Sequence, residues 1–254
     1  MPDDPTSRFA ALLDAPDELP LDRAALQVAA HAMPGLDVDG QLARLDDLAA
    51  GVPTATPAGL TAHLVDDLGF TGDRSTYHDA RNSLLPEVLD RRSGIPLSLA
   101  IVAIEVGRRC GVGLVGVGMP GHFLVRPLDH HDRFIDLFDG GAVLDRAGCH
   151  AVFSRLHTGA AWQERFLEPV GPVDIVSRML ANHANAYRRV GDRSALCWVM
   201  DLRLRLPGAT ERDRRELAVL LGAAGRYDQA ATVLEASDAE RDQESAQRLR
   251  ARLN

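Results

Sequence analysis

Apolar residues recur at helical spacing through the first part of the chain. Leu42, Leu45 and Leu48 share one face of a helix predicted over residues 39–50. Similar spacing predicts further helices over residues 8–13, 21–31 and 56–68. Together these segments predict a helical N-terminal cap over residues 1–69.

The pattern changes in the middle of the chain. Residues 70–92 are predicted to form a polar, irregular stretch that leads into a short helix. Residues 97–106 are apolar on every face except at Ser98 and Glu105, which is typical of a helix buried in a core. Helices followed by adjacent strands predict an α+β core with an antiparallel sheet over residues 70–171. The predicted strands cover residues 112–117, 123–125, 134–137 and 142–144.

From residue 173 the chain is predicted to be helical to its end. Gly191 and Gly225 lie 34 residues apart, and this period with Gly between paired helices is the pattern of tetratricopeptide repeats. Residues 172–254 are therefore predicted to form a tetratricopeptide-like helical tail of about two units. Fewer than three units rarely stand alone, so we expect the tail to pack against the core.

The composition narrows the possible classes of function. The chain has 254 residues, with 28 basic residues that are all Arg, 36 acidic residues and a formal net charge of −8. This balance argues against general binding of nucleic acids or anionic membranes. We find no run of roughly 18 apolar residues and no signal peptide, and the three cysteines form no metal-binding pair. We therefore expect a cytoplasmic protein with no cofactor and no metal site.

Three segments of the core carry candidate chemistry. The buried helix begins within residues 93–98, His122 opens a predicted strand, and Asp136 lies on the next one. A nucleophile at a helix N-terminus, a His base and an acid that orients the His form the catalytic core of papain-like enzymes. The three segments occur here in that chain order, so the sequence predicts a His122–Asp136 pair facing the start of the helix.

The motifs around these residues are long and specific. They are Asp79-Ala-Arg-Asn-Ser83, Leu89-Asp-Arg-Arg92, Gly94-Ile-Pro-Leu-Ser-Leu-Ala100, Gly116-Val-Gly-Met-Pro-Gly-His-Phe-Leu-Val-Arg126 and Phe134-Ile-Asp-Leu-Phe-Asp-Gly-Gly141. Residues 70–144 resemble the core of the transglutaminase-like superfamily. The whole chain is similar to the bacterial SirB-type family, which joins such a domain to tetratricopeptide-like helices. The resemblance implies a papain-like fold more directly than it implies an activity.

One position departs from the active members of the superfamily. Their helix opens with Gly-x-Cys, and the resemblance puts Gly94 on the Gly and Pro96 on the Cys. Proline offers no nucleophile, so a first hypothesis is a pseudoenzyme in which Pro96 lines a cleft. Such a protein binds an unknown protein or peptide partner through this cleft or through the tail. A second hypothesis is a hydrolase or acyl transferase that uses Ser98, His122 and Asp136.

A third hypothesis is a different chemistry that combines His122 with a polar side chain of the preceding loop. Asp79, Arg81 and Asn82 either line a pocket beside the helix start or cap the helix that follows them. Arg126 lies four residues beyond His122 and shares its strand face. It either binds a carboxylate or pairs with a surface acid.

Overall fold

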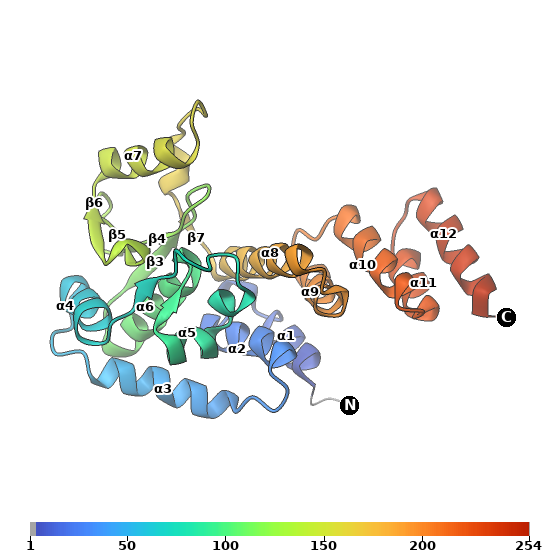
Figure 1. The fold of residues 1–254 in the computed structure, drawn as a ribbon, viewed down its shortest axis with the longest axis horizontal. Coiled ribbons are helices and arrows are strands. Elements are labelled where there is room, and N and C mark those ends of the chain that lie inside the picture. Colours follow the sequence, from blue (N-terminus) through green and yellow to red (C-terminus); the bar gives the residue numbers. More distant parts are fainter. Residues whose placement is uncertain (1–3, 254) are drawn as a thin grey trace.

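The N-terminal part of the chain is helical, as predicted. The computed structural model describes residues 4–253, and the first three helices run along the lower side of Figure 1. The N-terminal elements are α1 (Pro5–Leu12), η1 (Pro16–Glu18), α2 (Leu21–Ala32), α3 (Val38–Ala50) and α4 (Pro57–Ala62). The predicted helix over residues 56–68 is present in two parts, because α4 continues as a π-helical turn, η2 (His63–Asp67).

A five-stranded antiparallel sheet forms the centre of the core, in the order β6-β5-β4-β3-β7. Its strands are β3 (Leu114–Val117), β4 (Leu124–Pro127), β5 (Phe134–Asp136), β6 (Ala142–Leu144) and β7 (Pro169–Val170). The other core elements are β1 (Thr71–Gly72), η3 (Ala80–Ser83), α5 (Leu85–Arg91), β2 (Ser93–Gly94), α6 (Pro96–Cys110), η4 (Leu137–Asp139), α7 (Arg146–Leu156) and η5 (Glu164–Leu167). Strands β1 and β2 pair in parallel as a separate small sheet.

The two faces of the sheet pack against different helices. Val125 and Ile135 are register partners, and both join the main hydrophobic core that contains α6. Leu124 and Phe134 alternate with them and pack in a second cluster with residues of α7. The core is therefore α+β, as predicted, although helix α7 and edge strand β7 were not predicted.

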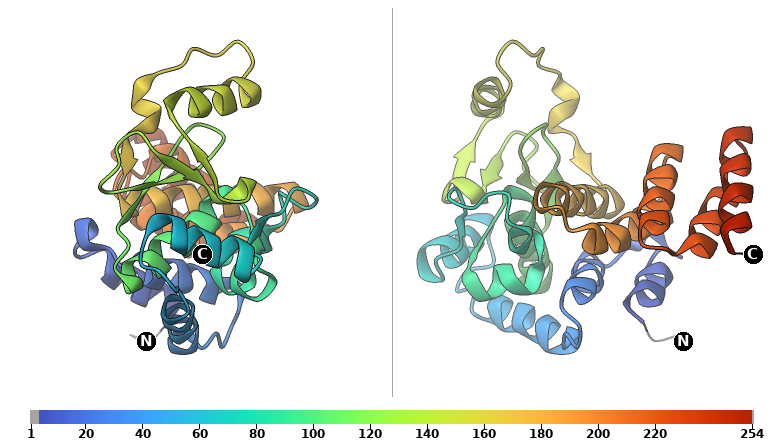
Figure 2. Two further views of the ribbon diagram at one scale, coloured as in Figure 1. Left: turned by 90° about the vertical axis from the view of Figure 1, so that its left-hand side faces the viewer. Right: turned by 45° about the vertical axis from the view of Figure 1, so that its right-hand side comes forward.

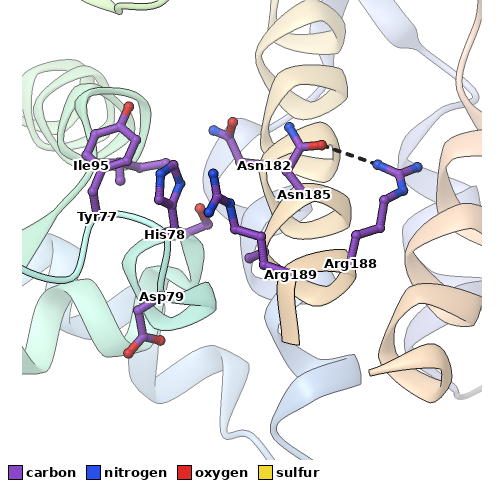
Figure 3. Close-up of a pocket in the computed structure, with 10 residues that line it drawn as sticks. Tyr77, His78, Asp79, Ile95, Asn182, Asn185, Arg188 and Arg189 are labelled. Carbon is purple, nitrogen blue, oxygen red and sulfur yellow. Dashed lines mark hydrogen bonds between the residues drawn. The ribbon is translucent and has the colours of Figure 1, made fainter. Parts of the chain in front are cut away.

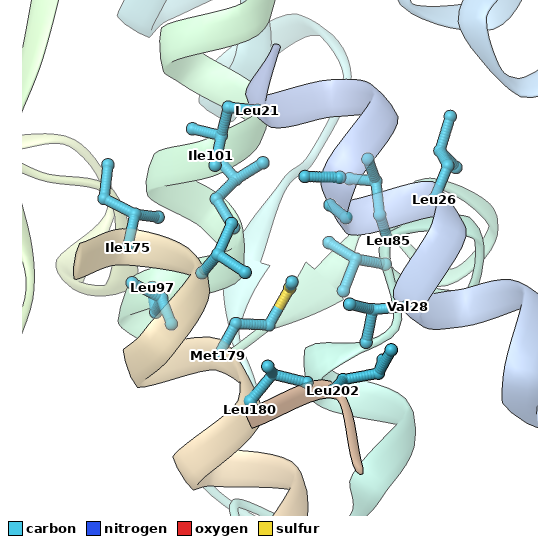
Figure 4. Close-up of a cluster of buried hydrophobic side chains, with 14 of the residues drawn as sticks. Leu21, Leu26, Val28, Leu85, Leu97, Ile101, Ile175, Met179, Leu180 and Leu202 are labelled. Atoms are coloured by element: carbon cyan, nitrogen blue, oxygen red, sulfur yellow. The ribbon is translucent and has the colours of Figure 1, made fainter. Parts of the chain in front are cut away.

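The buried helix α6 is the element around which the main core forms. It begins with Pro96, whose fixed φ suits the first turn, and ends at Gly111, whose φ of +79° is readily adopted by glycine. Figure 4 shows Leu97 and Ile101 meeting side chains of α2 and α8. The expectation of a helix buried on nearly every side agrees with this packing.

The C-terminal part is an array of helices that extends away from the sheet (Figures 1 and 2). Its elements are α8 (Pro172–Val190), α9 (Arg193–Arg205), α10 (Glu211–Ala223), α11 (Tyr227–Glu235), α12 (Glu240–Arg250) and η6 (Ala251–Leu253). Gly191 and Gly225 have φ of +71° and +74° and lie at the two turns between paired helices. The first helix, α8, packs into the main core through Ile175, Met179 and Leu180 (Figure 4).

A buried charge network joins α2 and α3 to the far end of α6. The Arg109 guanidinium donates to Asp22 Oδ2 at 2.5 Å, to Glu105 Oε2 at 2.7 Å and to Asp46 Oδ1 at 2.7 Å. Asp22 and Glu105 are both buried. Burial raises the pKa of Glu105, while Arg109 helps to hold the pKa of Asp22 below its usual range against the effect of burial. Two buried carboxylates thus share the guanidinium of Arg109, which is itself only slightly exposed.

We expect Arg109→Met to destabilise the protein strongly, because it removes the less exposed of the two arginines that bond the buried carboxylates of Asp22 and Glu105. The substitution keeps much of the side-chain volume. The free energy of unfolding should fall by about 3–5 kcal/mol, as measured by urea denaturation. The matched control is Arg108→Met, because Arg108 bonds to the same two acids but has a largely exposed side chain. Its cost should be about 1 kcal/mol or less. Equal losses for the two variants would contradict this account of the network.

His183 lies in the contact between α8 and the core. It is fully buried and packs against Tyr187 and Trp198, and neither ring nitrogen has a hydrogen-bond partner among residues 4–253. Burial lowers the pKa of His183 from 6.5 to about 4. The imidazole is therefore neutral in the folded protein at neutral pH.

This low pKa makes stability depend on pH. Below pH 6.5 the unfolded chain binds a proton at His183, whereas the folded chain does not bind it until the pH approaches 4. The free energy of unfolding therefore falls as the pH is lowered from 6.5 towards 4. We expect the free energy of unfolding of His183→Phe to fall by about 3 kcal/mol less than that of the wild type over this pH interval. Urea titrations at several pH values measure this difference. The control His131→Gln removes an exposed histidine and should keep the wild-type slope. Parallel curves for wild type and His183→Phe would show that this group does not sense pH.

Candidate functional site

The structure brings His122 and Asp136 together. His122 Nε2 lies 2.7 Å from Asp136 Oδ2, and the two residues are only 8% and 3% exposed. The other carboxylate oxygen, Oδ1, accepts the backbone N–H groups of Phe138 and Asp139, each at 3.1 Å. A carboxylate held in this way accepts the Nε2 proton, which leaves the lone pair of the ring on Nδ1.

Arg178 of α8 fixes the turn that carries this histidine. Its guanidinium donates to the carbonyl oxygens of His122 at 2.9 Å and Met119 at 3.3 Å, and it lies 5.1 Å from the centre of the Phe123 ring. Burial lowers the pKa of Arg178 from its ordinary value. The first helix of the tail therefore helps to position a residue of the core, and no pattern in the sequence predicts this contact.

Aromatic side chains cover the dyad on another side. The Phe138 ring lies edge-on to His122 at 6.1 Å, and Tyr77 lies edge-on to Phe138 at 5.9 Å. Arg74 lies over the Phe138 ring and also bonds Asp139 at 2.6 Å. The polar loop before α5 thus folds over the His122–Asp136 pair.

Ser98 is not joined to this pair. It is 4% exposed, and its hydroxyl donates to the carbonyl oxygen of Asn82 at 2.6 Å and accepts the backbone N–H of Ile95 at 3.1 Å. Within residues 4–253 no hydrogen bond links Ser98 to His122. Gly94 is required by the same arrangement, because a Cβ atom there would lie 2.5 Å from the Ser98 hydroxyl. The serine therefore fastens the start of α6 to the preceding loop.

Asn82 is the centre of that loop. It is fully buried, and its amide donates to Asp73 at 3.1 Å and to the Thr76 carbonyl at 2.8 Å, while its oxygen accepts from Arg91 at 2.8 Å. Hydrogen bonds, above all from Thr76, hold the pKa of Asp73 well below its usual range. Asp73, Thr76 and Arg91 were missed by the sequence analysis, although an Asp followed closely by Ser and Thr is a signal of a side-chain-stabilised turn.

The remaining predicted site residues have separate environments. Asp79 and Arg81 form an ion pair at 2.7 Å, which lowers the pKa of Asp79. Pro96 occupies the first turn of α6. Arg126 lies on β4, and its Nε is buried without a hydrogen-bond partner in the part of the chain that the structure describes. The structure shows no bond between these four residues and the dyad.

None of the three cysteines lies at the start of α6. Cys149 is fully buried, and burial raises its pKa to about 12. Burial also raises the pKa of Cys197 in the tail. Cys110 lies at the far end of α6, where its thiol bonds the Gly107 carbonyl. A thiolate is the reactive form of cysteine, so these environments do not favour nucleophilic attack.

A polar cavity of about 460 Å³ opens between the loop at residues 77–79 and α8 (Figure 3). Tyr77, His78 and Asp79 line it from the loop side, and Ile95 lines it just before α6 begins. From α8 it is lined by two asparagines, Asn182 and Asn185, and two arginines, Arg188 and Arg189. Asp79 is the one predicted pocket residue that lines this cavity.

Metal binding and membrane crossing each require a recognisable arrangement of residues. Within residues 4–253 no group of three His, Cys, Asp or Glu side chains is placed to hold a metal ion. None of the helices in that range combines the length and apolar character needed to cross a membrane.

Comparison with known proteins gives a consistent picture. A profile of the transglutaminase-like superfamily matches residues 21–181, from α2 into α8. A UPF0162 protein of Xylella fastidiosa (strain Temecula1) is 38% identical over 175 residues, which are 65% of this chain and 62% of that protein. A UPF0162 protein of Pseudomonas aeruginosa is 32% identical over 178 residues, or 66% of this chain and 65% of the relative. The chain thus spans less than two thirds of the length of these relatives.

The same kind of segment occurs in a larger animal protein. F-box only protein 21 of Mus musculus is 33% identical over 137 residues, which are 50% of this chain and 21% of that protein. No solved structure matches the chain.

The position of Ser98 generates a prediction that separates a structural serine from a nucleophile. Ser98→Ala leaves the buried Asn82 carbonyl without its hydroxyl donor, so the free energy of unfolding should fall by about 1–3 kcal/mol in urea denaturation. A fluorophosphonate probe, which labels activated serines, should not modify Ser98 in the wild type, as read by peptide mass spectrometry. Labelling that disappears in both Ser98→Ala and His122→Ala would establish the hydrolase hypothesis instead.

Proposed function

The chain belongs to the transglutaminase-like superfamily, and on this basis we propose that it binds an acidic protein or peptide partner without hydrolysing it. The observation that carries the binding proposal is an arginine-lined groove of about 520 Å³ between α10 and α12. We infer that the tail consists of two tetratricopeptide-like units, as in the SirB-type family that the sequence resembles.

The groove combines apolar and cationic lining. Ala218, Leu234 and Leu249 contribute apolar surface, and Val219, also in the lining, is 71% exposed. An exposed large apolar side chain inside a concave surface favours contact with another molecule. The groove can therefore accept an apolar side chain of a partner.

The charges of the groove favour an acidic partner. The one acid in the lining, Asp242, is buried and already bonded to Arg215 at 2.8 Å. Arg241 lies 3.7 Å from the same Asp242, and Arg248 lies 3.9 Å from Glu244, but both arginine side chains are mostly exposed. With Arg252, the arginines of the lining outnumber its one acid. This cationic groove lies on a chain whose formal net charge is −8. Complementary charge favours both the rate and the specificity of association with an acidic segment.

The core supports binding more than hydrolysis. The position of the superfamily's nucleophile is Pro96, and the nearest hydroxyl, on Ser98, is committed to Asn82 and Ile95. Recurrence of a related segment within F-box only protein 21, where it makes up 21% of the chain, is in keeping with a domain that is reused as a module. The Ser98–His122–Asp136 hydrolase remains the alternative, and it requires the loop that carries Asn82 to release Ser98.

The proposal is tested by fluorescence anisotropy with a peptide that carries a fluorophore at its N-terminus, fluorescein-Asp-Glu-Leu-Asp-Glu-Leu-amide. We expect Arg241→Gln combined with Arg248→Gln to weaken binding by about tenfold or more, because two exposed charges of the groove are lost. Raising the salt from about 0.05 to 0.5 M should weaken wild-type binding as well. Mass spectrometry should recover the peptide uncut.

The matched control is Arg155→Gln combined with Arg193→Gln, which removes two exposed arginines outside the groove. It should bind like the wild type. The proposal fails if both double variants bind alike, or if a peptide with Ser in place of both Leu binds equally well. Tighter binding of a single-stranded oligonucleotide of equal charge would point to a nucleic-acid surface instead.

A further inference from the structure

We propose that the cavity between the 77–79 loop and α8 binds the carboxyl-terminal unit of an acylated amino acid, which is a carboxylate next to an amide and an apolar side chain. Two sources supply this chemistry, a free N-acylated amino acid and the end of a polypeptide chain. The site is separate from the groove of the tail, because the two are lined by different helices.

Polar residues on α8 are spaced so that they face the cavity together. Asn182, Asn185 and Arg189 lie at positions i, i+3 and i+7, so they follow one face of the helix, and all three line the cavity. In Figure 3 Arg189 extends from this face towards the loop that carries His78. Asn182 and Asn185 can bond the amide of the ligand, and Arg189, further along the helix, can bond the carboxylate that follows this amide.

One positive charge of the cavity lining remains unpaired among the residues that the structure describes. Arg188 bonds Glu216 at 2.7 Å, and Asp79 bonds Arg81 at 2.7 Å. In Figure 3 the Asp79 carboxylate points away from the α8 side chains. Arg189 has no ion pair within residues 4–253, so it gives the cavity an uncompensated positive charge. A guanidinium binds a carboxylate in bidentate geometry, which makes Arg189 the residue that fixes the acid.

The two asparagines of the cavity offer hydrogen-bond partners for an amide. The side chain of Asn182 makes no hydrogen bond in the described range, and Asn185 is bonded only through its oxygen, to Arg188 at 3.3 Å. Both side chains therefore have N–H donors to offer, and Asn182 also has a free oxygen. An amide group presents one donor and one acceptor, and an asparagine satisfies both.

The cavity also has an apolar wall and the volume of a small-molecule site. Tyr77 is 38% exposed and is held in place by Phe138, while Ile95 and Ala186 add further apolar lining. A volume of about 460 Å³ falls in the range of small-molecule sites, which is about 300–1,000 Å³. An aliphatic side chain packed on Tyr77 and Ile95 would leave the carboxylate directed at Arg189.

The test uses isothermal titration calorimetry of the full chain with three probes. N-acetyl-leucine carries the carboxylate, N-acetyl-leucinamide lacks it, and acetyl-Ala-Ala-Leu presents it at a chain end. We expect N-acetyl-leucine to bind about tenfold more tightly than the amide. If acetyl-Ala-Ala-Leu binds at least tenfold more tightly than N-acetyl-leucine, the natural ligand is the end of a polypeptide chain. If these two probes bind with equal affinity, the natural ligand is a free N-acylated amino acid.

Variants locate the binding. Arg189→Gln should weaken the binding of N-acetyl-leucine by about tenfold and leave the binding of N-acetyl-leucinamide unchanged. Arg193 is an exposed arginine outside the cavity, so Arg193→Gln should change neither affinity. NMR signals of the side-chain amides of Asn182 and Asn185 should shift on titration. The proposal is overturned if acid and amide bind equally, if both arginine variants weaken binding alike, or if inorganic phosphate binds as tightly as N-acetyl-leucine.

Discussion

The burial of α6 on nearly every side is the constraint on which the rest of the structure depends. A helix without a polar face must be enclosed, and here the sheet, the N-terminal helices and α8 all contribute to its enclosure. The polar groups at its two ends then have to be satisfied inside the protein. Ser98 is bonded to Asn82 at one end, and Glu105 shares Arg109 with Asp22 at the other.

The same constraint bears on chemistry. In an enzyme of this architecture the first turn of the central helix presents a nucleophile to the His–Asp pair. Here that turn contains Pro96, and its one hydroxyl is turned towards a backbone carbonyl. The pair itself is well ordered, because Asp136 is held by two backbone N–H groups and His122 by Arg178. These hydrogen bonds therefore stabilise the local fold around the His122–Asp136 pair, whether or not a reaction takes place there.

Sequence reasoning succeeded where periodicity is strong and failed where contacts are distant. The apolar faces predicted α6 and most of the N-terminal helices, and the order of the strands predicted that His122 and Asp136 would meet. The prediction that His122 opens a strand was wrong, because His122 lies in the turn two residues before β4. The orientation of Ser98 could not be predicted, because it depends on a carbonyl 16 residues away in a polar loop. Helix α7 was missed because its apolar stripe is reduced to a few buried residues. The cavity and the groove both require helices to be placed side by side.

The double role of α8 makes the tail an integral part of the core. Ile175, Met179 and Leu180 fill the interior beside α6, and Arg178 holds the turn of His122. The tail therefore has no hinge at its first helix, and removing it would expose apolar surface and release the histidine. Anything captured on the later helices is consequently connected to the core through a helix that is itself part of that core, without an intervening linker.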